Sequence, residues 1–291
     1  MTAAMIREID HVVVLVDALD AASARFRELG FTVVPGGRHP RATHNALVCF
    51  RDGSYLELIA FWDTAATDHP FHRHLAAGPS LIAYALGVAD LAETVAALRA
   101  RGIAYGDPVA GARRRPDGAE VVWRMAFAAD AERLGLPFLI EDVTDRALRV
   151  PDQGATAHAN GARGIACLLV AVPDLAAAAS AYAALLEPLS AAPPALAWEQ
   201  VTATTGFRAG AQRVELGEPG GAGPAADHLV VHGAGPYAVV LRGPGGRAIH
   251  PREAAGARLR IAADDAGPPP TRGGQDRTGR AMEKQRRRET R

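Results

Sequence analysis

Short apolar runs rich in β-branched residues alternate with helical patterns along the chain. Residues 9–16 read IDHVVVLV, which is typical of a buried β-strand. The next segment has apolar residues at helical spacing and ends at a glycine: Leu19, Ala22, Phe26, Leu29 and Gly30. Candidate strands follow at residues 31–34, 45–50 and 55–61, with the turn sequence Asp52-Gly53 joining the last two. These patterns predict one β-α-β-β-β unit.

The same unit recurs twice. A second copy begins with SLIAYALGV at residues 80–88, and a third begins with IACLLVAV at residues 165–172. In each copy a valine ends the strand and a leucine begins the helix: Val16 and Leu19, Val88 and Leu91, Val172 and Leu175. Further strands of the second copy are expected near residue 104, at 120–126 and at 137–143. The repetition predicts at least three modules.

The pattern weakens after the third helix. Weaker candidate strands lie at residues 200–204, 212–216, 236–242 and 257–261, and GEPGGAGPAAD reads as a loop. The segment between the last two strands includes GPGG and is too short for another helix, so a fourth module is expected to be truncated. Residues 263–291 are basic, without apolar periodicity, and predict a disordered tail. We therefore expect an α+β protein with paired modules over residues 6–150 and a degenerate second unit over residues 160–262.

Composition and charge narrow the classes of function. The chain is 48% hydrophobic and 22% charged, which is ordinary for a globular protein. Its formal net charge is zero, so no general field favours nucleic acid or an anionic membrane. Cys49 and Cys167 form no CxxC pair, which argues against a disulfide framework or a zinc ribbon. No apolar run approaches a membrane span and no signal peptide is visible, so we expect a cytoplasmic protein.

Three ionisable residues in apolar strands are the candidate chemistry: His11, Glu57 and Glu141. Taken singly, His11 reads as a hydrogen-bonded core histidine and Glu57 as a solvent-facing strand residue. Together, one imidazole and two carboxylates would suit a divalent ion such as iron, manganese, nickel or zinc, with positions left open for substrate oxygens. Without a metal, Glu57 and Glu141 would instead serve as a general acid or base.

Two further segments carry polar side chains. The loop GGRHPRATHN offers Arg38, His44 and Asn45 as substrate contacts, although a solvated loop explains it equally well. The histidine-rich residues 68–74 favour a polar connector between modules over a metal clip, because no acidic partners follow at a regular spacing.

The segments HVVV, THNALVCF, YLELIAF and LPFLIED, in this order, resemble the glyoxalase-like domain of the vicinal oxygen chelate superfamily. The resemblance implies that paired modules form a cupped barrel, with metal ligands on the first and last strands of each module. It places His11, Glu57 and Glu141 at three ligand positions and Ala83 at the fourth. Ala83 cannot bind a metal, and His39 or His44 is a possible replacement. In the third module Cys167 aligns with His11, and Glu215 lies in a segment similar to YLELIAF.

The resemblance leaves the reaction open. It implies a small-molecule cup and favours a metal-dependent lyase or isomerase that acts on vicinal oxygens. The alternative is a metal-free protein that binds or sequesters a small molecule, as drug-resistance members do, and Ala83 favours this second class. Ring-cleaving dioxygenases are a third class, which keeps two histidines and one glutamate. The C-terminal unit is expected to be structural or to form a homodimer, because the edge of the third module needs cover.

Overall fold

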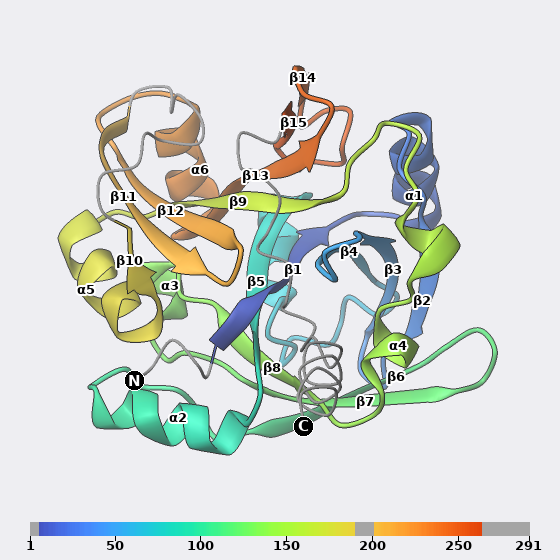
Figure 1. Ribbon diagram of the computed structural model, residues 1–291, viewed down its shortest axis with the longest axis horizontal. Coiled ribbons are helices and arrows are strands. Elements are labelled where there is room, and N and C mark those ends of the chain that lie inside the picture. The colour runs from blue at the N-terminus through green and yellow to red at the C-terminus, as the bar shows by residue number, and fades with distance from the viewer. Residues whose placement is uncertain (1–5, 190–200, 264–291) are drawn as a thin grey trace, which may run out of the picture.

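The computed structural model describes residues 6–189 and 201–263 (Figure 1). Its strands form a closed barrel of eight strands, in the order β1-β4-β3-β2-β6-β7-β8-β5, and a second sheet of seven strands. Figure 1 shows the two sheets side by side, with β5 of the barrel against β13 of the second sheet. The α+β class and the cupped arrangement of paired modules are confirmed.

The barrel consists of the first two modules. The first contains β1 (Ile6–Leu15), α1 (Leu19–Glu28), β2 (Val34–Arg38), β3 (Thr43–Cys49) and β4 (Tyr55–Phe61). The second contains β5 (Ser80–Val88), α2 (Leu91–Ala100), β6 (Val109–Arg114), β7 (Glu120–Ala126), α3 (Ala131–Leu134) and β8 (Phe138–Asp142). The strand predicted at residues 31–34 is wrong, because β2 begins only at Val34. Phe31 instead packs against Phe26, with 5.7 Å between ring centroids, and closes the end of α1.

The two modules are related by a two-fold arrangement about the β1–β5 pair. His11 lies opposite Ala85 and Val13 lies opposite Ala83 in this antiparallel pair. The position equivalent to His11 is therefore Ala83, as the resemblance implies. Each first strand also pairs in parallel with the last strand of its own module, β1 with β4 and β5 with β8.

The second sheet repeats this plan incompletely. Its strands are β9 (Gly164–Ala171), β10 (Glu187–Pro188), β11 (Val201–Ala209), β12 (Gln212–Pro219), β13 (Gly235–Gly243), β14 (Arg247–Ile249) and β15 (Leu259–Ala263). Two helices belong to the same region of the chain, α5 (Leu175–Leu185) and α6 (Pro224–His232). Three residues join β13 to β14, so the fourth module is truncated as expected, and β13 covers the edge of β9. The loop predicted at GEPGGAGPAAD is confirmed only for residues 220–223, because β12 continues to Pro219 and a proline in the first turn begins α6.

The barrel has two apolar layers. Val12 and Val14 belong to the outer layer with Phe26 of α1, whereas Val13 and Leu15 belong to the interior. Three short helices lie outside these modules: η1 (His72–Ala77), α4 (Arg146–Arg149) and η2 (Gln153–Thr156). No helix in the described part of the chain is long and apolar enough to cross a membrane. The predicted tail falls mostly on residues 264–291, outside the described residues, and the domain division stays a prediction.

Candidate functional site

A β-bulge in β1 creates the polar centre of the barrel. The register of β1 against β5 shifts between Ile9 and His11, so that Asp10 is the extra residue. Asp10 and His11 are both buried, at 1% and 3% exposure. Regular alternation would put Ile9 on the same face as His11, but the bulge places Ile9 in the outer apolar layer. Because of the bulge, the adjacent polar side chains of Asp10 and His11 both face one site, although the residues that follow them in the strand are aliphatic.

Asp10 is anchored by Arg149, a buried arginine from α4. The Nη1 and Nη2 atoms of Arg149 each donate to one oxygen of Asp10, both at 2.8 Å. Nε of Arg149 donates to Asp142 at 2.5 Å, and Nη1 donates to the hydroxyl of Tyr55 at 2.8 Å. Burial alone would raise the pKa of Asp10, but the charge and hydrogen bonds of Arg149 hold that pKa well below its usual value, with further lowering from His11 and Arg146. Asp10 is therefore a carboxylate at neutral pH.

His11 connects Asp10 to the interior. Its Nδ1 lies 2.7 Å from Oδ1 of Asp10, and because that carboxylate only accepts, Nδ1 carries the proton. The imidazole stacks on Tyr55, with ring centroids 4.6 Å apart, and meets the edge of Phe138 at 5.4 Å. Nε2 then lies 3.5 Å from Oε2 of Glu57. Asp10 and Tyr55 therefore fix the orientation of the imidazole ring, and its Nε2 faces the carboxylate of Glu57.

Glu57 is the buried anion of the interior, at 8% exposure. Its Oε1 accepts a hydrogen bond from Nδ2 of Asn45 at 2.6 Å and lies 3.9 Å from Nε2 of His39. Burial raises the pKa of Glu57, but His11, His39 and the Asn45 hydrogen bond outweigh burial, and the net shift is downward. The interpretation of Glu57 as a solvent-facing residue is therefore wrong, since Glu57 is ionised inside the barrel.

His39 approaches the same carboxylate from the β2–β3 connection. Its Nδ1 lies 2.8 Å from the hydroxyl of Thr43, and its ring stands edge-on to Trp123 at 6.0 Å. Burial lowers the pKa of His39 to about 4, against the opposing charge of Glu57, so the ring is neutral at pH 7. Two imidazoles thus present Nε2 to one carboxylate, each with Nδ1 held by a neighbouring group.

Glu141 does not join this centre, and the prediction that it does is wrong. Val13 pairs with Glu57, and Ala85, the equivalent of Val13, pairs with Phe138. Phe138 therefore occupies the position of Glu57 in the second module. Glu141 lies on the outer face of β8, where it accepts from the backbone N–H of Leu91 at 3.2 Å and from Arg124 at 2.6 Å. Its place is at the beginning of α2, where a carboxylate is favoured by the helix dipole.

The three residues predicted to contact the substrate lie in different parts of the structure. Asn45 lies in the interior and bonds Glu57. Arg38 is exposed, with its guanidinium 4.0 Å above the ring of Trp62. His44 neighbours Asn45 on β3 and therefore lies on the opposite face of that strand. The structure brings neither Arg38 nor His44 to Glu57.

The expected metal-ligand group of His11, Glu57 and Glu141 is not formed. Among the described residues, no three His, Cys, Asp or Glu side chains are already arranged to hold a metal ion. The histidine-rich connector is built into the fold, as its polar-connector interpretation requires: His69 meets the edge of Phe61 at 4.9 Å, and His74 is buried.

The second sheet has an equivalent position without the same chemistry. Glu215 pairs with Leu169 as Glu57 pairs with Val13, but Glu215 forms an ion pair of 2.9 Å with Arg213. Cys167 stands where His11 stands in the barrel, and burial raises the pKa of its thiol. That thiol is therefore a poor nucleophile and a poor ligand at neutral pH.

Comparison with known proteins agrees with this architecture. The sequence profile described as a glyoxalase-like domain matches residues 9–186, which is more than half of the chain. The chain belongs to the glyoxalase-like domain family. No curated protein sequence matches this glyoxalase-like protein significantly.

Solved structures share its fold at low identity. A hypothetical protein from Staphylococcus aureus is 14% identical, covers 88% of this chain and 98% of its own, and superposes with a TM-score of 0.68. A mutant of 4-hydroxymandelate synthase from Streptomyces coelicolor is 16% identical, covers 82% of this chain and 71% of its own, and gives a TM-score of 0.56. Methylmalonyl-CoA epimerase from Mycobacterium tuberculosis is 22% identical, covers 50% of this chain and 93% of its own, and gives a TM-score of 0.39. The likeness to 4-hydroxymandelate synthase shows that this glyoxalase-like protein has the fold of the vicinal oxygen chelate superfamily.

Buried neutral histidines predict that acid destabilises the fold. Burial lowers the pKa of both His39 and His74 to about 4, from 6.5. The unfolded chain binds protons first, so their contribution is fully present above pH 6.5 and is lost as the pH falls towards 4. We expect each to change the free energy of unfolding by up to about 1.4 kcal/mol per pH unit in that window. Urea unfolding between pH 4 and 7 measures this slope. The slope should flatten in a His39→Asn/His74→Asn variant and stay in His44→Asn, and an unchanged slope in the first would contradict the assignment.

Proposed function

We propose that this glyoxalase-like protein is an enzyme of the lyase or isomerase kind, acting on a small molecule with two neighbouring oxygens. The observation that carries the proposal is the environment of Glu57, a buried carboxylate that two oriented imidazoles face. An ion held in a dry interior acts strongly on a bound substrate, because few water molecules screen its charge. A core that served only stability would gain little from such a group.

Glu57 is the proposed proton acceptor. Its Oε1 is fixed by Asn45, which leaves Oε2, on the His11 side, to take a proton from a carbon beside a carbonyl group. His11 lies 3.5 Å from that oxygen, and its Nε2, which has no proton while Nδ1 carries one, is placed to accept a hydrogen bond from a substrate hydroxyl or to take the proton over from Glu57. Asp10 keeps the other nitrogen of His11 protonated and stabilises positive charge on the ring.

The walls of the interior suit a small, partly apolar molecule. Tyr55, Phe138 and Trp123 border the polar centre through their ring contacts with His11 and His39. The side chains of Glu57 and His39 keep 10% and 13% of their surface accessible, so the centre is largely but not fully closed to solvent. Two open hollows, one beside α4 and one beside β13, are lined by neither residue.

Proton exchange tests the proposal without knowledge of the natural substrate. The protein would be incubated in deuterated water with 2-hydroxy ketones, 2-hydroxy aldehydes and 1,2-dicarbonyl compounds, and deuterium at the carbon next to the carbonyl followed by proton NMR. We expect saturable exchange with at least one of these compounds. Saturable binding without exchange would instead support a sequestering protein, and neither binding nor exchange would contradict the proposal.

A divalent metal at the same centre is the second candidate, favoured by the donor set. The donors would be Nε2 of His11, Nε2 of His39 and the carboxylate of Glu57, which together are two imidazoles and one anion. Glu57 is ionised and His39 is neutral at pH 7, and these are the states in which carboxylates and imidazoles bind metals. Asp10 and Thr43 hold the opposite ring nitrogens, as outer partners of ligating histidines do. Bound iron, manganese, nickel or zinc would polarise a substrate oxygen as a Lewis acid.

His39, which faces Glu57, and His44, which the structure does not bring to Glu57, provide a matched test of the metal. Protein purified without chelators would be measured by elemental mass spectrometry as wild type, His39→Ala and His44→Ala. If the metal candidate is right, we expect near-stoichiometric metal in wild type and His44→Ala and a loss of at least tenfold in affinity in His39→Ala. Equal metal in all three variants would place the metal elsewhere. Absence from all three, even after incubation with divalent ions, would leave the metal-free acid–base site.

A further inference from the structure

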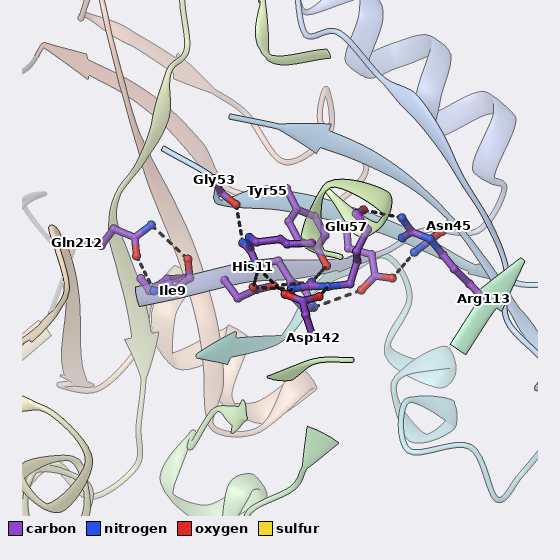
Figure 2. A network of polar contacts seen from close by, with 12 residues as sticks. Ile9, His11, Asn45, Gly53, Tyr55, Glu57, Arg113, Asp142 and Gln212 are labelled. Atoms are coloured by element: carbon purple, nitrogen blue, oxygen red, sulfur yellow. Dashed lines mark hydrogen bonds and ion pairs between the residues drawn. The ribbon is translucent and has the colours of Figure 1, made fainter. Parts of the chain in front are cut away.

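The second sheet reaches the polar centre of the barrel through the side chain of Gln212. This residue begins β12 and is 5% exposed. Its Oε1 accepts from the backbone N–H of Ile9 at 2.5 Å, and its Nε2 donates to the carbonyl of Ile9 at 3.2 Å (Figure 2). The amide thus pairs with Ile9 as a neighbouring β-strand would.

Ile9 needs such a partner because of where its own neighbours begin and end. The pairing of β4 with β1 starts at His11, opposite Tyr55, so β4 does not cover the edge of β1 at Ile9. The register with β5 is also interrupted between Ile9 and His11. Ile9 is fully buried, and a buried backbone N–H or C=O without a partner costs free energy comparable to a lost hydrogen bond. Gln212 satisfies both groups next to the bulge.

The turn before Gln212 lies very close to the backbone of the same part of β1. Gly210, between β11 and β12, has a φ of +61°, and a Cβ atom there would lie 2.4 Å from the carbonyl oxygen of Arg7. The hairpin therefore approaches β1 so closely that a side chain at residue 210 would collide with its backbone. Two contacts, one at Arg7 and one at Ile9, hold β1 immediately before Asp10.

We propose that Gln212 is a positioning residue for His11. By holding Ile9, it fixes the bulge that turns both Asp10 and His11 into the interior, and it thereby sets the 2.7 Å contact between their side chains. The inference rests on the proposed function only for its effect on turnover, since the effect on His11 itself is independent of any reaction. The second sheet then serves the site in the first barrel, although its own equivalent of His11 is Cys167.

Imidazole NMR of the full chain tests this role. Protein labelled with ¹⁵N would be compared as wild type, Gln212→Ala and Asn160→Ala. Asn160 is the matched control because its amide also bonds two backbone groups, the carbonyl of Leu29 and the N–H of Ala162, each at 3.1 Å. We expect both variants to melt at lower temperature. Only Gln212→Ala should lose the single Nδ1-protonated form of His11 and lower proton exchange, on the order of tenfold to a hundredfold.

The outcomes separate this inference from the proposed function. If the His11 signals in Gln212→Ala match wild type, the inference is overturned, whatever the exchange rate. If those signals change while wild type exchanges no substrate proton, the positioning role stands and the proposed function fails. Should Gln212→Ala not fold, Gln212→Glu keeps the acceptor for Ile9 but lacks the donor at neutral pH, and we expect it to shift the His11 signals in the same direction.

Discussion

Replacing Glu57 by Gln is expected to lower proton exchange by about 10²- to 10⁴-fold, the usual contribution of a positioned general base. The amide keeps the size of the side chain and one acceptor oxygen, but it removes the negative charge that faces His11 and His39. The fold should persist, because the amide oxygen can still accept the hydrogen bond from Asn45. Exchange rates and thermal unfolding of the same samples measure both effects.

Glu141 supplies the control for this prediction. Glu141→Gln lies on the outer face of β8, where it weakens the contact with Leu91 and the partly exposed ion pair with Arg124. Such surface pairs contribute at most about 1 kcal/mol, so a small loss of stability and an unchanged exchange rate are expected. A Glu57→Gln variant that exchanges as fast as wild type, or a Glu141→Gln variant that loses exchange, would refute the assignment of the base.

The largest effect on stability is expected from Arg149→Met, a loss of about 3–5 kcal/mol in the free energy of unfolding. Arg149 is 2% exposed and donates to both oxygens of Asp10, which is itself 1% exposed. Without the guanidinium, Asp10 keeps Arg146 and His11 as partners, but Arg146 is partly exposed and screened by water. Urea unfolding at pH 7 provides the measurement.

Two controls locate the cause of that loss. Arg133→Met removes an exposed partner of Asp130, with 3.2 Å between the charged groups, and should cost less than about 1 kcal/mol. Asp10→Asn/Arg149→Met removes both buried charges and should recover much of the stability lost in Arg149→Met. A loss below 1 kcal/mol in Arg149→Met, or no recovery in the double variant, would mean that the buried pair is not what holds this end of the barrel.

The modules could be predicted because each begins with a signal that is local in the sequence. A β-branched run that ends at Val16 or Val88 and passes into a helix at Leu19 or Leu91 depends on neighbouring residues alone. The strands of residues 55–61, 80–88 and 120–126 were predicted with their observed bounds. Ala83 was also placed correctly as the equivalent of His11, and the two-fold pairing of β1 with β5 agrees with that equivalence.

The ligand positions on the last strands could not be predicted in the same way. YLELIAF and PFLIED are both apolar runs with one glutamate, and either can be aligned with the other in more than one register. The true register is set by pairing with a distant strand, Val13 with Glu57 and Ala85 with Phe138. Because side chains alternate between faces, an odd shift moves a residue to the other side of the sheet, and this is what separates Glu141 from Glu57.

The residues around His11 were missed because a bulge and a distant helix create their contacts. An aspartate next to a histidine in an aliphatic strand was the available signal for Asp10, but regular alternation would place its side chain on the opposite face from His11. Arg149 follows Asp10 by 139 positions and meets it only after α4 packs against the barrel. His39 was considered as a ligand but could not be separated from His44 without the register of β3.

The measurement that tests the central claim most directly is an imidazole ¹⁵N NMR titration of the wild-type protein with a 2-hydroxy ketone that it exchanges. We expect the signals of His11 and His39 to shift together and saturate, while those of His44, His228 and His232 stay in place. This expectation would be contradicted if His11 and His39 did not respond, and above all if His228 and His232, which line the hollow beside β13, moved in their stead.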